Sequence, residues 1–162
     1  MEEIIEKVDR NLIEQELTAD KYVRRANNGN SLIYILTAGN SPNILREIGR
    51  LREVTFRHAG GGTGKSIDLD EFDIGPHAYQ QLIVWNPQDK EIVGSYRFIK
   101  CKDAEFINGE AKLATTELFK FSDEFLKNYF PYTIELGRSF IQPQYQPSEE
   151  FRKGLFSLDN LW

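Results

Sequence analysis

The sequence predicts an α/β fold within about one domain. A chain of 162 residues is long enough to bury a core, and a composition of 40% hydrophobic and 12% aromatic residues argues against disorder. Stretches with apolar residues at helical spacing alternate with short apolar runs that suit buried strands. The longest such runs, at residues 32–36 and 82–85, are far shorter than the roughly 18 residues that a membrane span needs.

Charge and cysteine content narrow the class of protein. A formal net charge of −5 disfavours nucleic acid as a general partner. The single cysteine, Cys101, excludes an internal disulfide and a cysteine-rich zinc site. The N-terminal sequence MEEIIEKVDR is acidic, the opposite of a secretory signal. These features indicate a cytoplasmic protein.

The first forty residues predict a helical segment followed by a strand. Apolar residues recur at helical spacing between Ile4 and Leu17, so residues 2–26 are expected to be helical in one or two pieces. Residues 27–30, NNGN, predict a turn, and residues 31–38, SLIYILTA, predict a buried strand.

A longer helix is expected to begin after Ser41. This serine suits an N-cap, Pro42 suits the first helical position, and the helix should end near His58. The apolar residues of its inner face are Ile44, Ile48, Leu51 and Val54. The arginines assigned to its outer side are Arg46, Arg50, Arg52 and Arg57.

The second half predicts a hairpin, a helix and a further strand. Residues 78–85 and 91–100 read as two strands joined by a five-residue loop. A helix should begin near Ser122, a strand should occupy residues 132–142, and another helix should start after Ser148. Because that helix reaches Trp162 without a stop signal, the chain is expected to be a fragment. We divide it into residues 1–40, a helical segment and first strand, and residues 41–162, the N-terminal part of the main domain.

The glycine run has the spacing of a nucleotide-binding loop, with four residues between Ala59 and Gly64-Lys65-Ser66. A P-loop, however, follows a buried strand and opens a helix at the Lys-Ser step. These glycines follow an amphipathic helix, and the acidic sequence IDLDEFD comes next and would repel a triphosphate. We therefore expect a flexible loop that binds no phosphate.

The acidic turn at residues 68–73 predicts a network of charges. It is no EF-hand, because the fifth and sixth positions counted from Asp68 are Phe72 and Asp73. Apolar residues alternate with the acids, which indicates partial burial, and buried carboxylates need cationic partners. Arg97 and Arg138 lie within predicted strands and could pair with Asp70 and Asp73. Each could be structural only, but their coincidence with Arg52 and Glu135 favours a functional site.

Four motifs in this order resemble a known superfamily: LREVTF (51–56), DLDEFD (68–73), IVGSYRF (92–98) and ELGRSFIQPQYQ (135–146). They are similar to the GNAT-type branch that contains acyl-homoserine lactone synthases. They are more similar still to the ornithine- and glycine-lipid N-acyltransferases, often labelled hemolysin-like. The resemblance implies a mostly antiparallel GNAT-like sheet flanked by helices.

The resemblance also implies a bacterial N-acyltransferase of aminolipid synthesis. A (3-hydroxy) fatty acyl group would pass from a thioester on acyl carrier protein to the α-amine of an amino acid, with acyl-CoA as the alternative donor and no bound cofactor or metal. A second acyltransferase acting on the product and contact with the inner face of the membrane are further expectations. The rival functions are a CoA-dependent acetyltransferase and a non-catalytic module that binds lipid or carrier protein.

Site residues follow from the matching motif positions. The resemblance implies a charged cleft of Arg52, Asp70, Asp73, Arg97, Glu135 and Arg138, lined by Phe56. Glu135 would be the general base that deprotonates the attacking ammonium, through a water. The two aspartates would bind or orient the ammonium, and the arginines would hold the carboxylates in place.

Gly137 and the region after residue 148 complete the expected site. Glu135 and Arg138 are three residues apart, so a regular strand would point them to opposite faces; a β-bulge permitted by Gly137 would re-aim them and free a backbone N–H. That N–H could hold the oxyanion of the thioester carbonyl. Arg152 and Lys153 could bind the phosphate of the pantetheine arm. Because the Gly-x-Gly/Ala of CoA-using relatives is missing after the strand, carrier protein is the preferred donor.

The remaining reactive residues predict no site. His58 and His77 share no motif and are expected at the surface. Trp85 and Cys101 are expected to be packing residues, and no histidine close in sequence would make Cys101 a nucleophile.

Overall fold

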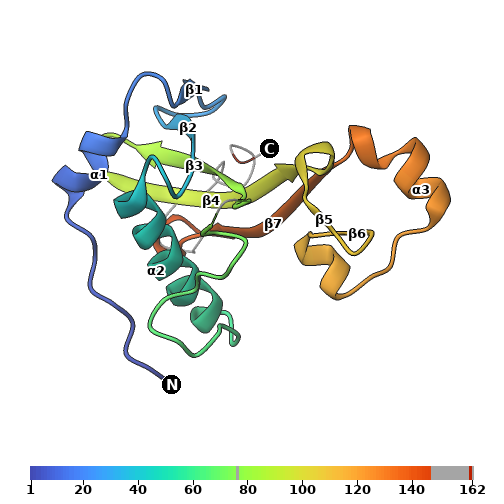
Figure 1. Ribbon diagram of the computed structural model, residues 1–162. Helices are drawn as coiled ribbons and strands as arrows, with labels where there is room; N and C mark the ends of the chain where they lie inside the picture. The colour runs from blue at the N-terminus through green and yellow to red at the C-terminus, as the bar shows by residue number, and fades with distance from the viewer. Residues whose placement is uncertain (76, 147–160, 162) are drawn as a thin grey trace.

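A five-stranded antiparallel sheet forms the centre of the fold (Figure 1). The computed structural model describes residues 1–75, 77–146 and 161. The sheet has the order β1-β2-β3-β4-β7, and its strands are β1 (Tyr22–Arg25), β2 (Leu32–Leu36), β3 (Gln80–Asn86), β4 (Glu91–Lys100) and β7 (Ile134–Ile141). Every neighbouring pair is antiparallel, which confirms the expected mostly antiparallel sheet with flanking helices.

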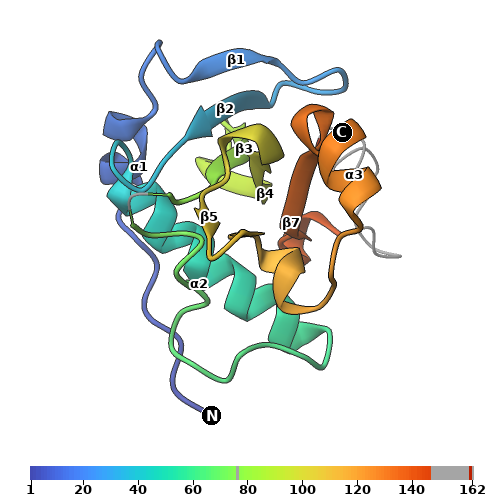
Figure 2. The same cartoon turned by 45° about the vertical axis from the view of Figure 1, so that its right-hand side comes forward.

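Helix α2 (Pro42–His58) covers one face of the sheet (Figures 1 and 2). Its apolar residues Ile44, Ile48 and Leu51 are almost completely buried, as the sequence predicted, and Val54 is half-buried. They pack against strand residues of the same face, which include Leu36, Ile83, Trp85, Ile92 and Phe140. This cluster is the main hydrophobic core.

The start of α2 is capped by a residue from another helix. Pro42 occupies the first turn as expected, but the side chain of Ser41 makes no capping hydrogen bond. The Glu16 carboxylate instead accepts hydrogen bonds from the backbone N–H groups of Asn43 and Ile44, at 3.0 and 2.8 Å. A carboxylate is favourable there because the N-terminus of a helix carries partial positive charge.

The expected helix over residues 2–26 is wrong for most of its length. Only α1 (Arg10–Glu16) forms, and the second expected piece, which would have continued through Val23, gives way to strand β1. Residues 1–9 run beside the loop that follows α2, where the N–H groups of Glu2 and Ile5 donate to the carbonyls of Gly64 and Ser66. Tertiary contacts of this backbone outweigh the helical spacing of its apolar residues.

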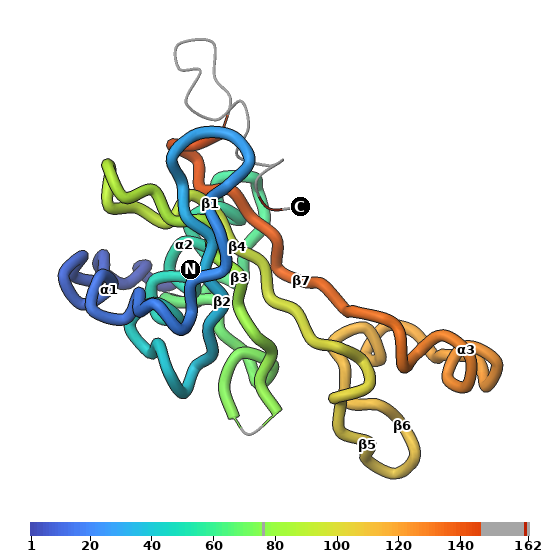
Figure 3. The backbone as a smooth tube through the Cα atoms, turned by 90° about the horizontal axis from the view of Figure 1, so that it is seen from above, coloured from blue at the N-terminus to red at the C-terminus, as the bar shows by residue number. Residues whose placement is uncertain are grey.

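Residues 101–133 form an arm that extends away from the sheet (Figures 1 and 3). It contains the short hairpin of β5 (Phe106–Ile107) and β6 (Glu110–Ala111), several 3₁₀ turns and α3 (Asp123–Asn128). As predicted, α3 begins after Ser122, whose hydroxyl accepts from the N–H of Phe125. The base of the arm packs on the sheet through a second apolar cluster, which includes Phe72, Tyr79, Cys101, Leu113 and Phe130.

Two expectations about the C-terminal part have different outcomes. The strand containing Glu135 is confirmed as β7, whereas the helix expected after Ser148 lies outside the described residues except for Leu161. None of the helices within the described ranges combines the length and apolar character that crossing a membrane requires.

Candidate active site

Arg52 and Asp73 form the buried centre of a charged network. The Nη1 atom of Arg52 donates to both carboxylate oxygens of Asp73 at 2.9 Å, and both side chains are fully buried. Gln81 on β3 completes the group, since it accepts from Arg52 at 2.9 Å and donates to Asp73 at 3.0 Å. Helix α2, the acidic turn and the sheet thus meet at one ion pair.

The placement of Arg52 corrects the expectation that it lies on the outer side of α2. Arg52 is 0% exposed, and Arg50 is also buried, bound to Glu47 by two hydrogen bonds. Arg52 lies one helical turn after Ile48 and therefore shares the face that meets the sheet. A sequence pattern read only by hydrophobicity assigns such a residue to solvent, although its partner Asp73 neutralises it inside.

Arg97 and Arg138 extend the network toward the surface. Arg97 on β4 donates to Asp70 at 2.6 Å and to Asp73 at 3.1 Å. The guanidinium of Arg138 on β7 lies 3.5 Å from Asp68 and 3.6 Å from Asp70. The expected pairing of the two aspartates with these arginines is confirmed, and three guanidinium groups face three carboxylates.

Burial and charge shift the pKa values of this network in opposite directions. Burial raises the pKa of Asp70, but the hydrogen bond and the charge of Arg97 outweigh it, so the pKa is lowered overall. Burial raises the pKa of Asp68, and the more distant charges of Arg138 and Arg52 do not offset it. Burial also lowers the pKa of Arg52 in spite of Asp73. Asp70 is therefore more firmly ionised than Asp68.

A β-bulge in β7 explains how Arg138 reaches the network. Ser95 and Arg97 on β4 are two residues apart, whereas their partners Phe140 and Gly137 are three apart, so β7 contains one extra residue. The bulge was predicted at Gly137. The backbone takes the left-handed conformation one residue later, at Arg138, where φ is 53°. A positive φ at an arginine is strained, and the strain here lies at a charged residue of the site.

Gly94 in the Val-Gly-x-x-Arg motif has a steric role. A Cβ atom at this position would lie 2.5 Å from the carbonyl oxygen of Phe140 and 2.5 Å from a methyl group of Ile141. Only glycine lets β4 and β7 approach this closely beside the bulge. The motif glycine therefore sets the strand spacing three residues before Arg97.

Glu135 is held by hydroxyl groups rather than by arginines. Tyr79 donates from its hydroxyl to Oε1 of Glu135 at 2.7 Å, and the hydroxyl of Thr115 donates to Oε2 at 2.5 Å. Glu135 is 8% exposed and lies where the arm joins the sheet. Its link to the charged network passes through Tyr79, whose ring lies 5.4 Å from the Arg97 guanidinium carbon.

Four residues of this region were missed by sequence reasoning: Asp68, Tyr79, Gln81 and Thr115. Asp68 was read as part of the turn, but it is 2% exposed, and its Oδ2 atom has no hydrogen-bond partner among the described residues. A buried glutamine in a strand is a usable signal, because a polar side chain at an inward position needs a partner. The motif pattern contains no signal for Thr115.

The glycine run surrounds a carboxylate from its own chain. Glu53 on α2 accepts hydrogen bonds from the backbone N–H groups of Thr63 and Gly64, at 3.0 and 2.9 Å, and from the hydroxyl of Thr63. Arg57 donates to it as well, at 2.7 Å. Burial raises the pKa of Glu53, but these hydrogen bonds outweigh it and lower the pKa to about 2. Amides that would meet a phosphate in a P-loop already have an anionic partner.

The remaining described residues that were singled out in the sequence lie outside the charged network. Phe56 packs beside the main core, Trp85 and Cys101 are buried as predicted, and His58 and His77 are exposed. Arg152 and Lys153 lie outside the described residues. Gly137 is half-buried opposite Arg97.

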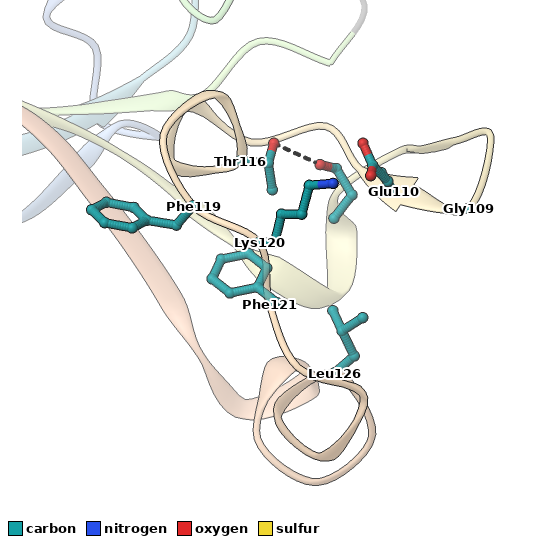
Figure 4. Close-up of a pocket in the computed structure, with 8 residues that line it drawn as sticks. Gly109, Glu110, Thr116, Phe119, Lys120, Phe121 and Leu126 are labelled. Carbon is teal, nitrogen blue, oxygen red and sulfur yellow. Dashed lines mark hydrogen bonds between the residues drawn. The ribbon is translucent and has the colours of Figure 1, made fainter.

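A cavity of about 140 Å³ lies in the arm, away from the charged network (Figure 4). Phe119, Phe121 and Leu126 form its apolar lining, and Glu110, Thr116 and Lys120 contribute polar groups. None of the charged-network residues lines it. Across the described part of the chain, no group of three His, Cys, Asp or Glu side chains is arranged to hold a metal ion.

The arrangement combines two chemical capacities. Asp70 and Arg138 are the network members with solvent access, at 31% and 35% side-chain exposure, so together they present opposite charges to a small zwitterion. Glu135 is a buried carboxylate in the strand that carries Arg138, three residues before it. The bulged part of β7 thus has an ion-pairing group at the surface and a carboxylate inside.

Comparisons with known proteins agree with this fold. Residues 51–153 match the family described as acetyltransferase (GNAT) domain. Two curated relatives, each named glycine N(alpha)-acyltransferase, align over 163 positions that include the whole chain: one from Bacteroides thetaiotaomicron at 55% identity and one from Phocaeicola vulgatus at 50%. The alignments cover 48% and 50% of these proteins, so the chain spans about half the length of the curated relatives it matches. No solved structure gave a significant match.

Proposed function

Since the chain belongs to the GNAT acetyltransferase domain family, we propose that it is part of an enzyme that transfers a fatty acyl group from acyl carrier protein to the α-amine of glycine. The observation that carries the proposal is the 55% identity, over the whole chain, to a protein named glycine N(alpha)-acyltransferase. That name favours glycine over ornithine as the acceptor. The product would be an acylated amino acid of lipid synthesis, and a second acyltransferase would act on it.

The exposed end of the charged network is the proposed acceptor site. Asp70 would bind the ammonium of glycine, because its Oδ2 atom has, among the described residues, only the 3.6 Å contact with Arg138. Arg138 would bind the glycine carboxylate through its partly exposed guanidinium. Asp73 would not touch the substrate, because Arg52, Arg97 and Gln81 already donate to its two oxygens.

Glu135 is the proposed general base. An N–H bond of the glycine ammonium would break as its proton passes to the carboxylate, directly or through a water, and the freed lone pair would attack the thioester carbonyl carbon. The carbon–sulfur bond would then break, and a second proton from the nitrogen would pass to the sulfur, which would leave the amide and the pantetheine thiol. A backbone N–H at the bulge that includes Arg138 would hold the oxyanion.

The donor and the cellular setting belong to the same proposal. The thioester would be delivered by acyl carrier protein in the cytoplasm, at or near the inner face of the membrane, with Arg152 and Lys153 near the pantetheine phosphate. The preference for this donor comes from the four sequence motifs, which resemble those of the hemolysin-like N-acyltransferases and the acyl-homoserine lactone synthases. Acyl-CoA is the alternative donor.

The test uses the protein at its full natural length. The purified enzyme is incubated with a 3-hydroxyacyl carrier protein or the matching acyl-CoA, and with glycine, ornithine or serine, while thiol release and acylated product are measured. We expect release only with carrier protein and glycine, and a loss of about 10²–10⁴ in turnover in Glu135→Gln. Equal rates with acyl-CoA would identify a CoA enzyme, and tight carrier-protein binding without thiol release would identify a non-catalytic module.

A further inference from the structure

The Glu135 carboxylate has a set of donors that comes from two distant parts of the chain. Tyr79 precedes β3 and donates to Oε1 at 2.7 Å. Thr115 lies in a 3₁₀ turn of the arm, at Ala114–Glu117, and donates to Oε2 from its hydroxyl at 2.5 Å and more weakly from its N–H at 3.4 Å. Neither residue belongs to the motifs that identified the family.

We propose that Tyr79 and Thr115 are positioning residues for the general base, and that Oε1 of Glu135 is the atom that receives the proton. The inference rests on the proposed function, in which Glu135 deprotonates the glycine ammonium. A carboxylate accepts about four hydrogen bonds, two at each oxygen. Within the described ranges of the chain, Thr115 supplies two donors to Oε2 and Tyr79 supplies one to Oε1, so the lone pair left open there is on Oε1.

The position of Tyr79 is itself fixed on several sides. Its side chain is 1% exposed, and its ring meets Phe72 edge to face with centroids 5.5 Å apart. Its hydroxyl accepts from the N–H of Ala114 at 3.0 Å, which orients the O–H bond toward Glu135. The Arg97 guanidinium carbon lies 5.4 Å from the ring centroid, within the range of a cation–π contact. Tyr79 therefore connects the acceptor-binding network to the base.

The arm determines the second contact. Thr116, next in sequence, donates to the carbonyls of Ala111 and Leu113 and so holds the turn that presents Thr115. Lys112 in the arm pairs with Glu71 in the acidic turn at 2.8 Å, which ties the two segments together. The arm thus reaches the base through one hydroxyl, and a change in the arm's position would change how Glu135 is held.

The chemistry balances without an added reactant. Two N–H bonds break on the way from the glycine ammonium to the amide. The first proton forms an O–H bond at Oε1, and the second goes to the pantetheine sulfur as the carbon–sulfur bond breaks, while Tyr79 and Thr115 keep their own protons. Because both hydroxyls donate to the Glu135 carboxylate, they hold it in one orientation, and removing one of them should leave that orientation less defined.

The experiment compares Tyr79→Phe and Thr115→Val in the full-length enzyme. We expect each to lower kcat about tenfold, as loss of one charge-assisted hydrogen bond typically would, with the KM for glycine unchanged within about twofold. Thr115→Ser should restore wild-type behaviour because it keeps the hydroxyl.

A matched control separates positioning of the base from the loss of a hydroxyl elsewhere. Tyr132→Phe removes the hydroxyl of a tyrosine that is 88% exposed and should keep the wild-type kcat. Thr116→Val loosens the turn that presents Thr115 and should lower kcat as well. A wild-type kcat in both Tyr79→Phe and Thr115→Val would overturn the inference, and so would an equal loss of kcat in Tyr132→Phe.

A second measurement does not depend on turnover. Carbon-13 NMR at neutral pH records the chemical shift of the side-chain carboxyl carbon of Glu135, assigned by its absence in Glu135→Gln. We expect this signal to move in Tyr79→Phe and Thr115→Val and to stay in Tyr132→Phe; an unchanged signal in the two variants would overturn the hydrogen-bond contacts. An inactive wild-type protein would overturn the proposed function, and the base role with it, while a changed signal would still confirm the contacts.

Discussion

Asp70 and Asp73 are three residues apart in the acidic turn, yet their carboxylates have different surroundings. Both oxygens of Asp73 accept from buried donors on three elements, and the side chain is fully buried. Asp70 is 31% exposed and shares its only close ion pair, at 2.6 Å, with Arg97. The two residues of one motif therefore have separate roles, one in the core and one at the surface of the site.

We expect Asp73→Asn to reduce stability and Asp70→Asn to reduce glycine binding. Asp73→Asn leaves two buried guanidinium groups short of a counter-charge, which typically costs about 3–5 kcal/mol. Asp70→Asn should raise the KM for glycine about tenfold or more while the melting temperature falls only slightly. Chemical denaturation beside steady-state kinetics measures both, and an Asp70→Asn enzyme with a normal KM would remove Asp70 from the acceptor site.

Glu53 gives the loop after α2 a pH-dependent contribution to stability. Its folded-state pKa of about 2 lies below the reference value of 4.5, so the contribution is complete above pH 4.5 and is lost as the pH falls toward 2. The difference corresponds to about 3 kcal/mol at about 1.4 kcal/mol per pKa unit. Glu53→Gln should therefore be less stable than the wild type near neutral pH, by up to that amount, and the gap should close in acid.

Lys65→Ala is the matched control in the same loop. The Lys65 side chain is exposed, so its truncation should change the free energy of unfolding by less than about 0.5 kcal/mol. Urea titrations of both variants at pH 7 and pH 3 would test this. A constant gap for Glu53→Gln across pH would contradict the assignment, and ATP binding that Lys65→Ala abolishes would restore the P-loop interpretation.

For single residues, the sequence predicted which charged side chains form the network, but it did not predict the uncharged side chains that contact them. Arg52, Asp70, Asp73, Arg97 and Arg138 come together as expected, because buried charges in an apolar pattern require partners. Tyr79, Gln81 and Thr115 were missed because they are uncharged, and their role arises only from contacts between residues far apart in the chain. No local pattern encodes which hydroxyl reaches Glu135.

At the scale of elements, the bulge in β7 couples backbone strain to function. Arg138 has a φ of 53°, a conformation that glycine adopts without the cost of about 1–2 kcal/mol that other residues bear. We expect Arg138→Gly to keep or raise the melting temperature while the KM for glycine rises strongly. Arg138→Lys is the control, because it keeps both the charge and the strain.

Calorimetry beside kinetics would decide this case. If Arg138→Gly melted at a much lower temperature than the wild type, the contacts of the arginine side chain would stabilise the fold more than the backbone strain destabilises it. If it bound glycine normally, Arg138 would have no part in the acceptor site.

Long elements with a clear apolar pattern were predictable from the sequence, and short elements were not. The boundaries of α2 followed from its cap and periodicity, and β3, β4 and β7 followed from their apolar runs. The N-terminal segment was mistaken for helix because Ile4, Ile5 and Val8 have helical spacing, whereas their backbone is held by the loop after α2. Strands β5 and β6 have two residues each, too few for a pattern.

At the scale of the whole molecule, β7 forms the outer strand of the sheet within the described residues. Its one partner strand there is β4, and Ile134 and Leu136 are 54% and 42% exposed on it. An apolar edge strand is prone to pair with another chain. We expect the isolated 162-residue chain to self-associate, and Leu136→Lys to weaken association at least about tenfold without lowering the melting temperature.

Sedimentation velocity over a range of concentrations tests this expectation. Ile107→Lys, on the arm hairpin and 46% exposed, is the control and should associate like the wild type. Monomeric wild type, or equal association of Leu136→Lys, would show that this edge is not a contact surface.

The strand order also bears on how the protein folds as it is synthesised. From β1 to β4, neighbours in the sheet are neighbours along the chain, so each strand meets its partner as soon as it leaves the ribosome. By the time residue 97 emerges, Arg52, Asp73 and Arg97 can pair in the growing core. Glu135 and Arg138 arrive with β7, after the whole arm has been made. A nascent chain would thus acquire its stable core before it acquires the proposed proton acceptor.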